Sequence, residues 1–292
     1  MSTSSIYRTP AGEAEIMHLY ESNWARLGIE YESRRVNTRF GVTHVATTGP
    51  VDAPPLVIFH GGNMINPISF EWFVPLTQEY RIYAPDTVGH PGRSAQTRLS
   101  PRDNSYGEWA ADVLDGLGLQ QAPCIGPSYG AGILIRLAAC APQRISKAVL
   151  LVPSGFVSPP LGPMIFEVII PMLLYRLVPS HERLAHALRA FAPEVDENVL
   201  EITGAVFKYV KIEPEMPRNA TREELAGYKA PTLVLAAERD IFFPAARVIE
   251  RARDIIPNLA AAEIIEGSPH MVPVSRQGYV VDRIRRFLKE TR

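Results

Sequence analysis

The chain of 292 residues is long enough to form one large α/β domain or two small ones. Its 30 basic residues nearly balance 31 acidic ones, and a formal net charge of −1 gives no electrostatic drive toward nucleic acid or an anionic membrane. A hydrophobic content of 46% with 21% charged residues is typical of a globular protein and excludes a disordered or fibrous chain.

The predicted elements begin with a helix over residues 11–27 and a strand over 39–47, where apolar and polar residues alternate. Short apolar runs further along the chain predict buried strands over 56–59, 80–84, 122–125, 148–152, 232–236 and 263–265. Helices are predicted over 107–117, 131–141 and 277–289. Strands that alternate with helices favour an α/β fold with a mostly parallel central sheet and helices on both faces.

The alternation breaks between residues 154 and 218, where the chain has helical segments, many prolines and no clear strand. We therefore expect a core domain made of residues 1–153 and 219–292, with a helical cap (lid) inserted at 154–218. Within this insertion the apolar stretch 161–178 is interrupted by Pro163, Glu167, Pro171 and Arg176. These interruptions argue against a membrane span and favour a buried or cleft-facing helix pair.

The N-terminus and the cysteines bear on the cell compartment. Residues 1–10 are polar and lack the apolar segment of a secretion signal. Cys124 lies in an apolar strand-like run and Cys140 in an alanine-rich helix-like run, so two buried free thiols are favoured over a disulfide. Both observations favour a cytoplasmic protein.

The pattern Gly-x-Ser-x-Gly occurs at residues 126–130, directly after a predicted strand and at the start of a predicted helix. This context makes Ser128 the predicted nucleophile, because a sharp strand-to-helix turn exposes its hydroxyl. The helix that follows points its N-terminus at Ser128, where free N–H groups favour developing negative charge. The alternative is a serine that caps an ordinary helix.

A His-Gly-Gly turn at residues 60–62 ends the first strongly apolar strand. Backbone amides in such a turn can face a substrate carbonyl, so the predicted oxyanion-hole donors are the N–H groups of Gly62 and Tyr129. A glycine-rich turn without a ligand is the alternative. His60 itself is predicted to be structural, since it lies at a strand end rather than on a late loop.

A base and an acid are predicted on the loops after the last two strands. His270 follows the last strand, and its imidazole can accept the proton of Ser128 near neutral pH. Asp240 follows the preceding strand and is the predicted partner of His270, with Glu238 as a weaker alternative. Asp86 precedes the serine in the chain and is interpreted as a residue that organises its loop.

Together these motifs resemble the α/β-hydrolase superfamily, in which the catalytic residues occur in the order serine, acid, histidine. The resemblance covers residues 40–288 and includes Asp86 with the loop 89–94. Residues 39–45 and 49–57 look more narrowly like the bacterial carboxylesterase Nap group, which implies hydrolysis of carboxylic esters. The chain departs from the usual patterns at Pro91 and Pro127, and neither change removes a catalytic group.

The motifs predict acyl transfer to Ser128 followed by hydrolysis, with no metal and no organic cofactor. The expected substrate is a small to medium hydrophobic ester. Substrate-binding positions are predicted in the insertion and beside the catalytic loops, at Asn63, Met164, Phe166, Ile169, Met172 and Met271. The apolar residues of the insertion could equally serve only to bury it against the core.

Several other functions are compatible with the same motifs. They are a cofactor-free haloperoxidase (perhydrolase), a lactonase, a carbon–carbon bond hydrolase and a ligand-binding receptor without turnover. Ser128 argues against dehalogenases and epoxide hydrolases, which attack with an aspartate. The expected partner is a small-molecule ester, and the sequence leaves the oligomeric state open, including a homodimer.

Overall fold

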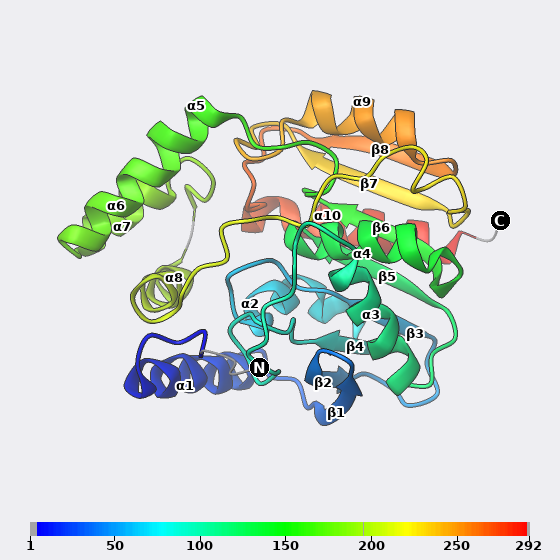
Figure 1. Cartoon of the computed structure of the whole chain (residues 1–292), viewed down its shortest axis with the longest axis horizontal. Coiled ribbons are helices and arrows are strands. Elements are labelled where there is room, and N and C mark those ends of the chain that lie inside the picture. Colours follow the sequence, from blue (N-terminus) through cyan, green and yellow to red (C-terminus); the bar gives the residue numbers. More distant parts are fainter. Residues whose placement is uncertain (1–4, 195, 291–292) are drawn as a thin grey trace.

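The computed structural model describes residues 5–194 and 196–290 and is built around an eight-stranded sheet (Figure 1). The strand order is β1-β2-β4-β3-β5-β6-β7-β8, with β1–β2 and β2–β4 antiparallel and the remaining pairs parallel. The strands span Glu32–Thr38 (β1), Gly41–Thr48 (β2), Pro55–Ile58 (β3), Arg81–Pro85 (β4), Ala122–Pro127 (β5), Ile145–Leu151 (β6), Thr232–Ala237 (β7) and Leu259–Ile265 (β8). The predicted mostly parallel sheet is therefore confirmed.

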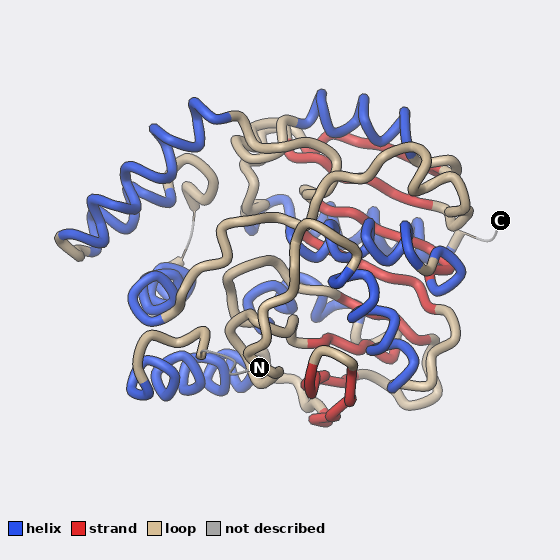
Figure 2. Tube along the Cα trace, in the orientation of Figure 1, coloured by secondary structure: helices blue, strands red, loops and turns tan. Residues whose placement is uncertain are grey.

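Helices cover both faces of this sheet (Figure 2). Two separate hydrophobic cores are buried between the helices and the sheet. One core packs under α3 (Ser105–Gly116), α4 (Tyr129–Cys140) and α9 (Ala245–Ile255). The other packs under α1 (Pro10–Arg26), α2 (Asn66–Phe70) and α10 (Val274–Lys289), with the 3₁₀ helices Glu71–Leu76 and Pro142–Arg144 in connecting segments. Successive strand residues alternate between the cores, because side chains on a strand point to opposite faces.

Two parts of the sheet differ from the sequence prediction. The pattern did not indicate β1, whose residues are mostly polar and exposed. An edge strand pairs on one side only and needs no apolar run, so its hydrophobic signal is weak. In β8, residues 259–262 are alanine-rich and only half-buried, which explains why the prediction began at residue 263.

The segment predicted to be a cap forms a helical arm that projects from the sheet (Figure 1). A continuous helix runs through α5 (Leu161–Pro163), the π-helical η3 (Met164–Ile169) and α6 (Ile170–Leu177), and is followed by α7 (His181–Leu188) and α8 (Glu197–Tyr209). We attribute the wider π winding to Pro171, which lacks an N–H and whose ring would clash with the carbonyl one turn earlier. Residues 1–4 of the polar N-terminus and residue 195 of this segment lie outside the described residues.

The prediction of a buried or cleft-facing helix pair at 161–178 is wrong. Phe166 is 71% exposed and Leu177 is 77% exposed, and most of the exposed large hydrophobic side chains of the described residues lie in this stretch. Apolar periodicity predicts a helix but does not say what covers it. Among the described residues, no helix combines the length and the apolarity that crossing a membrane requires.

The cysteines also differ in part from the prediction. Both are free, and Cys124 is buried in β5 as expected. Cys140 is exposed, because it is the last residue of α4 and lies where the helix reaches the surface. The expectation of two buried thiols therefore holds for Cys124 and is wrong for Cys140.

Candidate active site

Ser128 occupies a sharp turn between β5 and α4, with φ 51° and ψ −111°. A non-glycine residue at positive φ is strained, and its neighbours must leave room for the turn. A Cβ on Gly126 would lie 2.4 Å from the backbone of Gly130, and one on Gly130 would lie 2.0 Å from the carbonyl oxygen of Phe59. The two glycines of the motif are thus required by close backbone contacts, and the amide of Ser128 is held by the carbonyl of Leu151 at 2.8 Å.

The structure brings Ser128, His270 and Asp240 into one hydrogen-bonded chain. His270 Nε2 lies 2.9 Å from Ser128 Oγ, and His270 Nδ1 lies 2.7 Å from Asp240 Oδ2. The three residues come from the carboxyl ends of β5, β7 and β8, which share one edge of the parallel sheet. Because the Asp240 carboxylate can only accept, the proton of the imidazole resides on His270 Nδ1. His270 Nε2 therefore offers its lone pair to the serine hydroxyl.

The carboxylate and the imidazole are held in place from several sides. Asp240 Oδ1 accepts hydrogen bonds from the amides of Phe242 at 2.8 Å and Phe243 at 3.0 Å. The ring of Phe242 packs edge-on against His270, with 4.8 Å between ring centroids. The Asp240 side chain is 0% exposed and that of His270 12% exposed, so the carboxylate is fully buried and the imidazole keeps a small exposed part.

Glu238, the weaker candidate for the acid, lies in a different place. Its side chain is exposed, and its Oε2 accepts a hydrogen bond from the amide of Gly267 at 2.6 Å. This contact ties the end of β7 to the loop that carries His270. Among the described residues, no three His, Cys, Asp or Glu side chains come together as a metal site would require.

The predicted oxyanion residues lie against each other. A Cβ on Gly62 would be 2.8 Å from Tyr129 Cδ2, so the loop after β3 touches the first residue of α4. Tyr129 is the first residue of the helix, and its amide has no acceptor within the helix. No described residue accepts a hydrogen bond from the amide of Gly62 or of Tyr129, which leaves both available to a ligand.

Two buried histidines, His60 and His90, make hydrogen bonds that hold the loop after β3 in place. His60 Nδ1 donates to the carbonyl of Gly61 at 2.7 Å, and His60 Nε2 accepts from the amide of Thr87 at 2.9 Å. His90 Nδ1 accepts from the amide of Asn63 at 3.1 Å, where the backbone has a positive φ of 54°. Burial lowers the pKa of both imidazoles, so they are neutral and can accept these bonds.

The support from His90 was missed by the sequence analysis, which gave this histidine no function. It lies in a loop after β4, and its contact with residue 63 spans 27 positions in the chain. No local pattern signals such a contact. Its ring also packs on that of Tyr129, with 4.7 Å between centroids, so one histidine touches both halves of the predicted oxyanion hole.

The residues predicted to bind substrate fall into two groups. Met271 follows His270 directly, is half-buried and donates its amide to the carbonyl of Phe191 in the helical arm. Asn63 uses both side-chain polar atoms on the backbone of Glu213, at 2.8 and 2.7 Å. The asparagine therefore ties the loop after β3 to the segment after α8, and one N–H and one lone pair of its side chain stay free of these two bonds.

The four arm residues differ in burial. Met172 is 9% exposed and Met164 is half-buried, whereas Phe166 and Ile169 are 71% and 45% exposed. The last two side chains are largely exposed, so their place in a substrate pocket stays a prediction. Other large hydrophobic side chains of the stretch 161–178 are exposed as well.

Comparison with known proteins agrees with this fold. Residues 54–177 match the family model described as the alpha/beta hydrolase fold. The crystal structure of naproxen esterase (carboxylesterase NP) from Bacillus subtilis superposes with a TM-score of 0.83, at 23% identity over 97% of this chain and 100% of that one. With the sheet order and the serine turn, these matches show that the chain has the α/β-hydrolase fold.

The chain also resembles bacterial carboxylesterases over nearly its full length. Carboxylesterase YbfK of Bacillus subtilis (strain 168) is 28% identical over 283 residues, which cover 92% of each chain. The uncharacterized carboxylesterase nap of the same organism is 26% identical over 98% of this chain and 96% of its own. The resemblance stated from the sequence motifs is thereby confirmed.

Proposed function

We propose that this protein hydrolyses carboxylic esters through an acyl-enzyme on Ser128. The observation that carries the proposal is the hydrogen-bonded chain from Ser128 Oγ through His270 to Asp240, at 2.9 and 2.7 Å. The two full-length relatives are carboxylesterases, which supports a carboxylic ester hydrolase of the serine class.

In the first half of the reaction, Ser128 Oγ attacks the ester carbonyl while its proton moves to His270 Nε2. The amides of Gly62 and Tyr129 receive the negative charge that develops on the carbonyl oxygen. Asp240 stabilises the imidazolium through Nδ1. The carbon–oxygen bond to the alcohol then breaks, and His270 returns the proton to the leaving alcohol.

In the second half, water replaces the alcohol. His270 Nε2 takes a proton from the water, the resulting hydroxide attacks the acyl carbon, and the bond to Ser128 Oγ breaks. His270 returns the proton to Ser128 Oγ. The carboxylic acid product then dissociates, and the serine and histidine are back in their starting protonation states. All the acid–base steps use groups of this chain.

The helical insertion at 154–218 is proposed to act as the cap of this site. Two contacts support this: the bond between Met271 and Phe191, and the double bond between Asn63 and Glu213. Both join the insertion to loops that carry proposed site residues. A hydrophobic acyl or alcohol group fits the apolar character of the arm, and the two free cysteines support a reducing, cytoplasmic setting.

The proposal can be tested with p-nitrophenyl esters of increasing acyl length and a phosphonofluoridate that modifies activated serines. We expect hydrolysis of at least one ester in the series. Activity should fall in proportion to the fraction of Ser128 that carries the phosphonyl group, read by peptide mass spectrometry. Full activity with Ser128 completely modified, or no hydrolysis of any ester, would refute the proposal.

The assignment of Gly62 gives a separate prediction. Gly62→Ala introduces a Cβ 2.8 Å from the Tyr129 ring, so the loop must move away from α4. Because one oxyanion-hole donor is displaced, we expect kcat to fall by about 10²–10³, with KM changed much less. The measurement is steady-state hydrolysis of the best ester.

The matched control is Gly278→Ala in α10, where an added Cβ meets no atom within 4 Å. This variant is expected to keep the wild-type kcat. If Gly62→Ala also keeps it while remaining folded, the oxyanion assignment on this side is wrong.

A further inference from the structure

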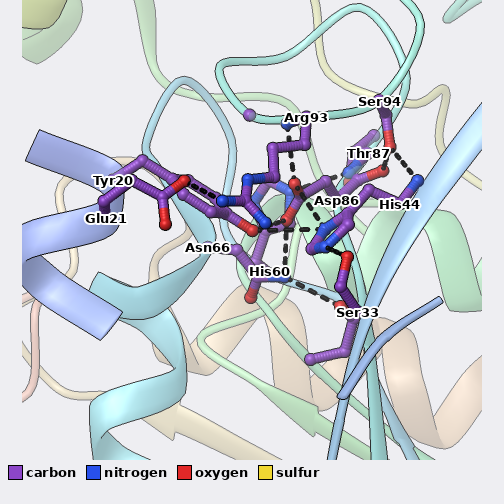
Figure 3. A network of polar contacts seen from close by, with 12 residues as sticks. Tyr20, Glu21, Ser33, His44, His60, Asn66, Asp86, Thr87, Arg93 and Ser94 are labelled. Carbon is purple, nitrogen blue, oxygen red and sulfur yellow. Dashed lines mark hydrogen bonds and ion pairs between the residues drawn. The ribbon is translucent and has the colours of Figure 1, made fainter. Parts of the chain in front are cut away.

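A second serine–histidine–aspartate chain lies on the antiparallel side of the sheet, on β1, β2 and the end of β4 (Figure 3). Ser33 Oγ lies 2.8 Å from His44 Nε2, and His44 Nδ1 lies 3.2 Å from Asp86 Oδ2. The same atoms meet in the same order as at Ser128. His44 is 4% exposed and Asp86 1% exposed, whereas Ser33 is exposed, so the chain opens to solvent at the hydroxyl.

Both oxygens of the Asp86 carboxylate accept hydrogen bonds from neighbouring groups. Oδ1 accepts from Tyr20 Oη at 3.1 Å and from Asn66 Nδ2 at 2.9 Å. Oδ2 accepts from the amide of Arg93 at 2.8 Å as well as from His44. Burial alone would raise the pKa of Asp86, but the hydrogen bonds from His44 and Arg93 lower it, and the group is ionised.

These contacts fix the orientation and tautomer of His44. Its Nδ1 faces the ionised carboxylate and therefore carries the proton. Tyr20 Oη lies 3.3 Å from His44 Nδ1. Because the tyrosine hydroxyl donates its proton to Asp86, it can only accept a hydrogen bond from this nitrogen. His44 Nε2 is left with a lone pair, and the hydrogen bond between it and Ser33 is donated by the serine.

Ser33 and His44 face a cleft of about 420 Å³. Arg35 lies two residues from Ser33 on the same face of β1 and is paired with His44 across the strands. The cleft is also lined by Arg93, Ser94, Gln96 and Glu13. Glu13 is hydrogen-bonded to Gln96, and the Arg93 guanidinium is paired with Glu21. Arg35 has no carboxylate partner among the described residues, so its guanidinium is the group of this cleft that is free to bind an anion.

We propose that Ser33 is a second acylatable serine, served by His44 and Asp86, which accepts an acyl group from activated donors that carry a carboxylate. In the step, Ser33 Oγ bonds to the acyl carbon and its proton moves to His44 Nε2. The bond from the acyl carbon to the leaving group breaks, and His44 returns the proton to that group. Arg35 binds the carboxylate of the donor.

The site at Ser33 differs from the one at Ser128 in ways that determine how fast its acyl group is expected to turn over. Ser33 lies within a regular strand and not in a strained turn at a helix N-terminus. No helix begins directly after Ser33, so it lacks the adjacent N-terminal amides that follow Ser128, and less negative charge can be stabilised on the carbonyl oxygen. We therefore expect one stable acyl group per chain and no rapid turnover.

The test uses the Ser128→Ala variant, so its outcome is independent of the function proposed for that serine. The variant is incubated with mono-p-nitrophenyl succinate or with neutral p-nitrophenyl acetate, and acylated peptides are identified by mass spectrometry. We expect a succinyl group on Ser33, formed roughly tenfold faster than the acetyl group because Arg35 attracts the succinyl carboxylate. Exposed Ser22, whose hydroxyl donates to the carbonyl of Leu19, is the internal control and should react far more slowly.

Three variants in the same background assign the residues. Arg35→Gln, at an exposed position, should bring the succinyl rate down toward the acetyl rate. His44→Gln should lower both rates by about 10²–10³, as loss of a general base does, and Ser33→Ala should remove the adduct. Absence of an adduct on Ser33, or a rate equal to that of Ser22, would overturn the proposal and leave the Ser33–His44 contact a structural hydrogen bond.

Discussion

Replacement of Ser128 by alanine is expected to lower kcat for ester hydrolysis by on the order of 10⁶. His270→Ala should cost about as much, and the double variant no more than either single one. The reason is that the serine and histidine act as a unit, so removing one part removes the benefit of the other. Asp240→Asn leaves the geometry largely in place but favours the wrong imidazole tautomer, with an expected loss of about 10⁴.

These rates are measured with a single ester under saturating conditions, after circular dichroism has shown that each variant is folded. The chain offers two control variants, one that changes a carboxyl group and one that removes a hydroxyl group. Glu238→Gln alters the weaker acid candidate, which accepts a hydrogen bond from the amide of Gly267, and Ser33→Ala alters the exposed serine on β1. Both should retain kcat within a few-fold. Additive losses for Ser128→Ala and His270→Ala would show that the two residues do not act together.

The contact between Ser128, Asp240 and His270 was predictable because it follows from topology. Each residue lies within five positions of the end of a predicted strand, and parallel strands present their carboxyl ends at one edge of a sheet. The serine turn was equally local, since the glycines at 126 and 130 are needed by backbone contacts within a few residues or with the adjacent strand. Residues far apart in sequence could thus be placed together without coordinates.

The chain from Ser33 to Asp86 shows where this reasoning stops. His44 was correctly predicted to lie in an early strand, and Asp86 was interpreted as a loop-organising residue. Ser33 lies on the polar edge strand that the hydrophobic pattern did not indicate. Its contact with His44 depends on the register of β1 against β2, which no periodicity in the sequence specifies.

The largest stability effect is expected at Glu224, the partner of a completely buried arginine. Arg136 in α4 is 0% exposed, and its guanidinium donates to Glu224 at 3.1 and 3.3 Å and to Asn104 at 3.2 Å. Removing the carboxylate leaves a buried cation without its counter-charge. We therefore expect Glu224→Ala to lower the free energy of unfolding by about 3–5 kcal/mol, measured by urea denaturation at pH 7.

The same pair predicts how this difference depends on pH. Burial would raise the pKa of Glu224, but hydrogen bonds from Arg136 and the Thr221 amide lower it from 4.5 to about 2. A carboxylate whose pKa is depressed on folding contributes its stability above the ordinary value and loses it as the pH falls through the depressed value. The gap between wild type and Glu224→Ala should thus be full at pH 6 and shrink between pH 4.5 and 2.

Two variants separate loss of the charge pair from loss of packing. Glu215→Ala removes the partner of exposed Arg102 and should leave stability unchanged, because water screens that pair. Replacing both buried partners, as Arg136→Met with Glu224→Leu, should recover most of the stability lost in Glu224→Ala, since no unpaired charge remains inside. If the double variant is instead less stable than Glu224→Ala, the arginine stabilises α4 by its packing and its bond to Asn104, and the ion pair is not the source of the effect.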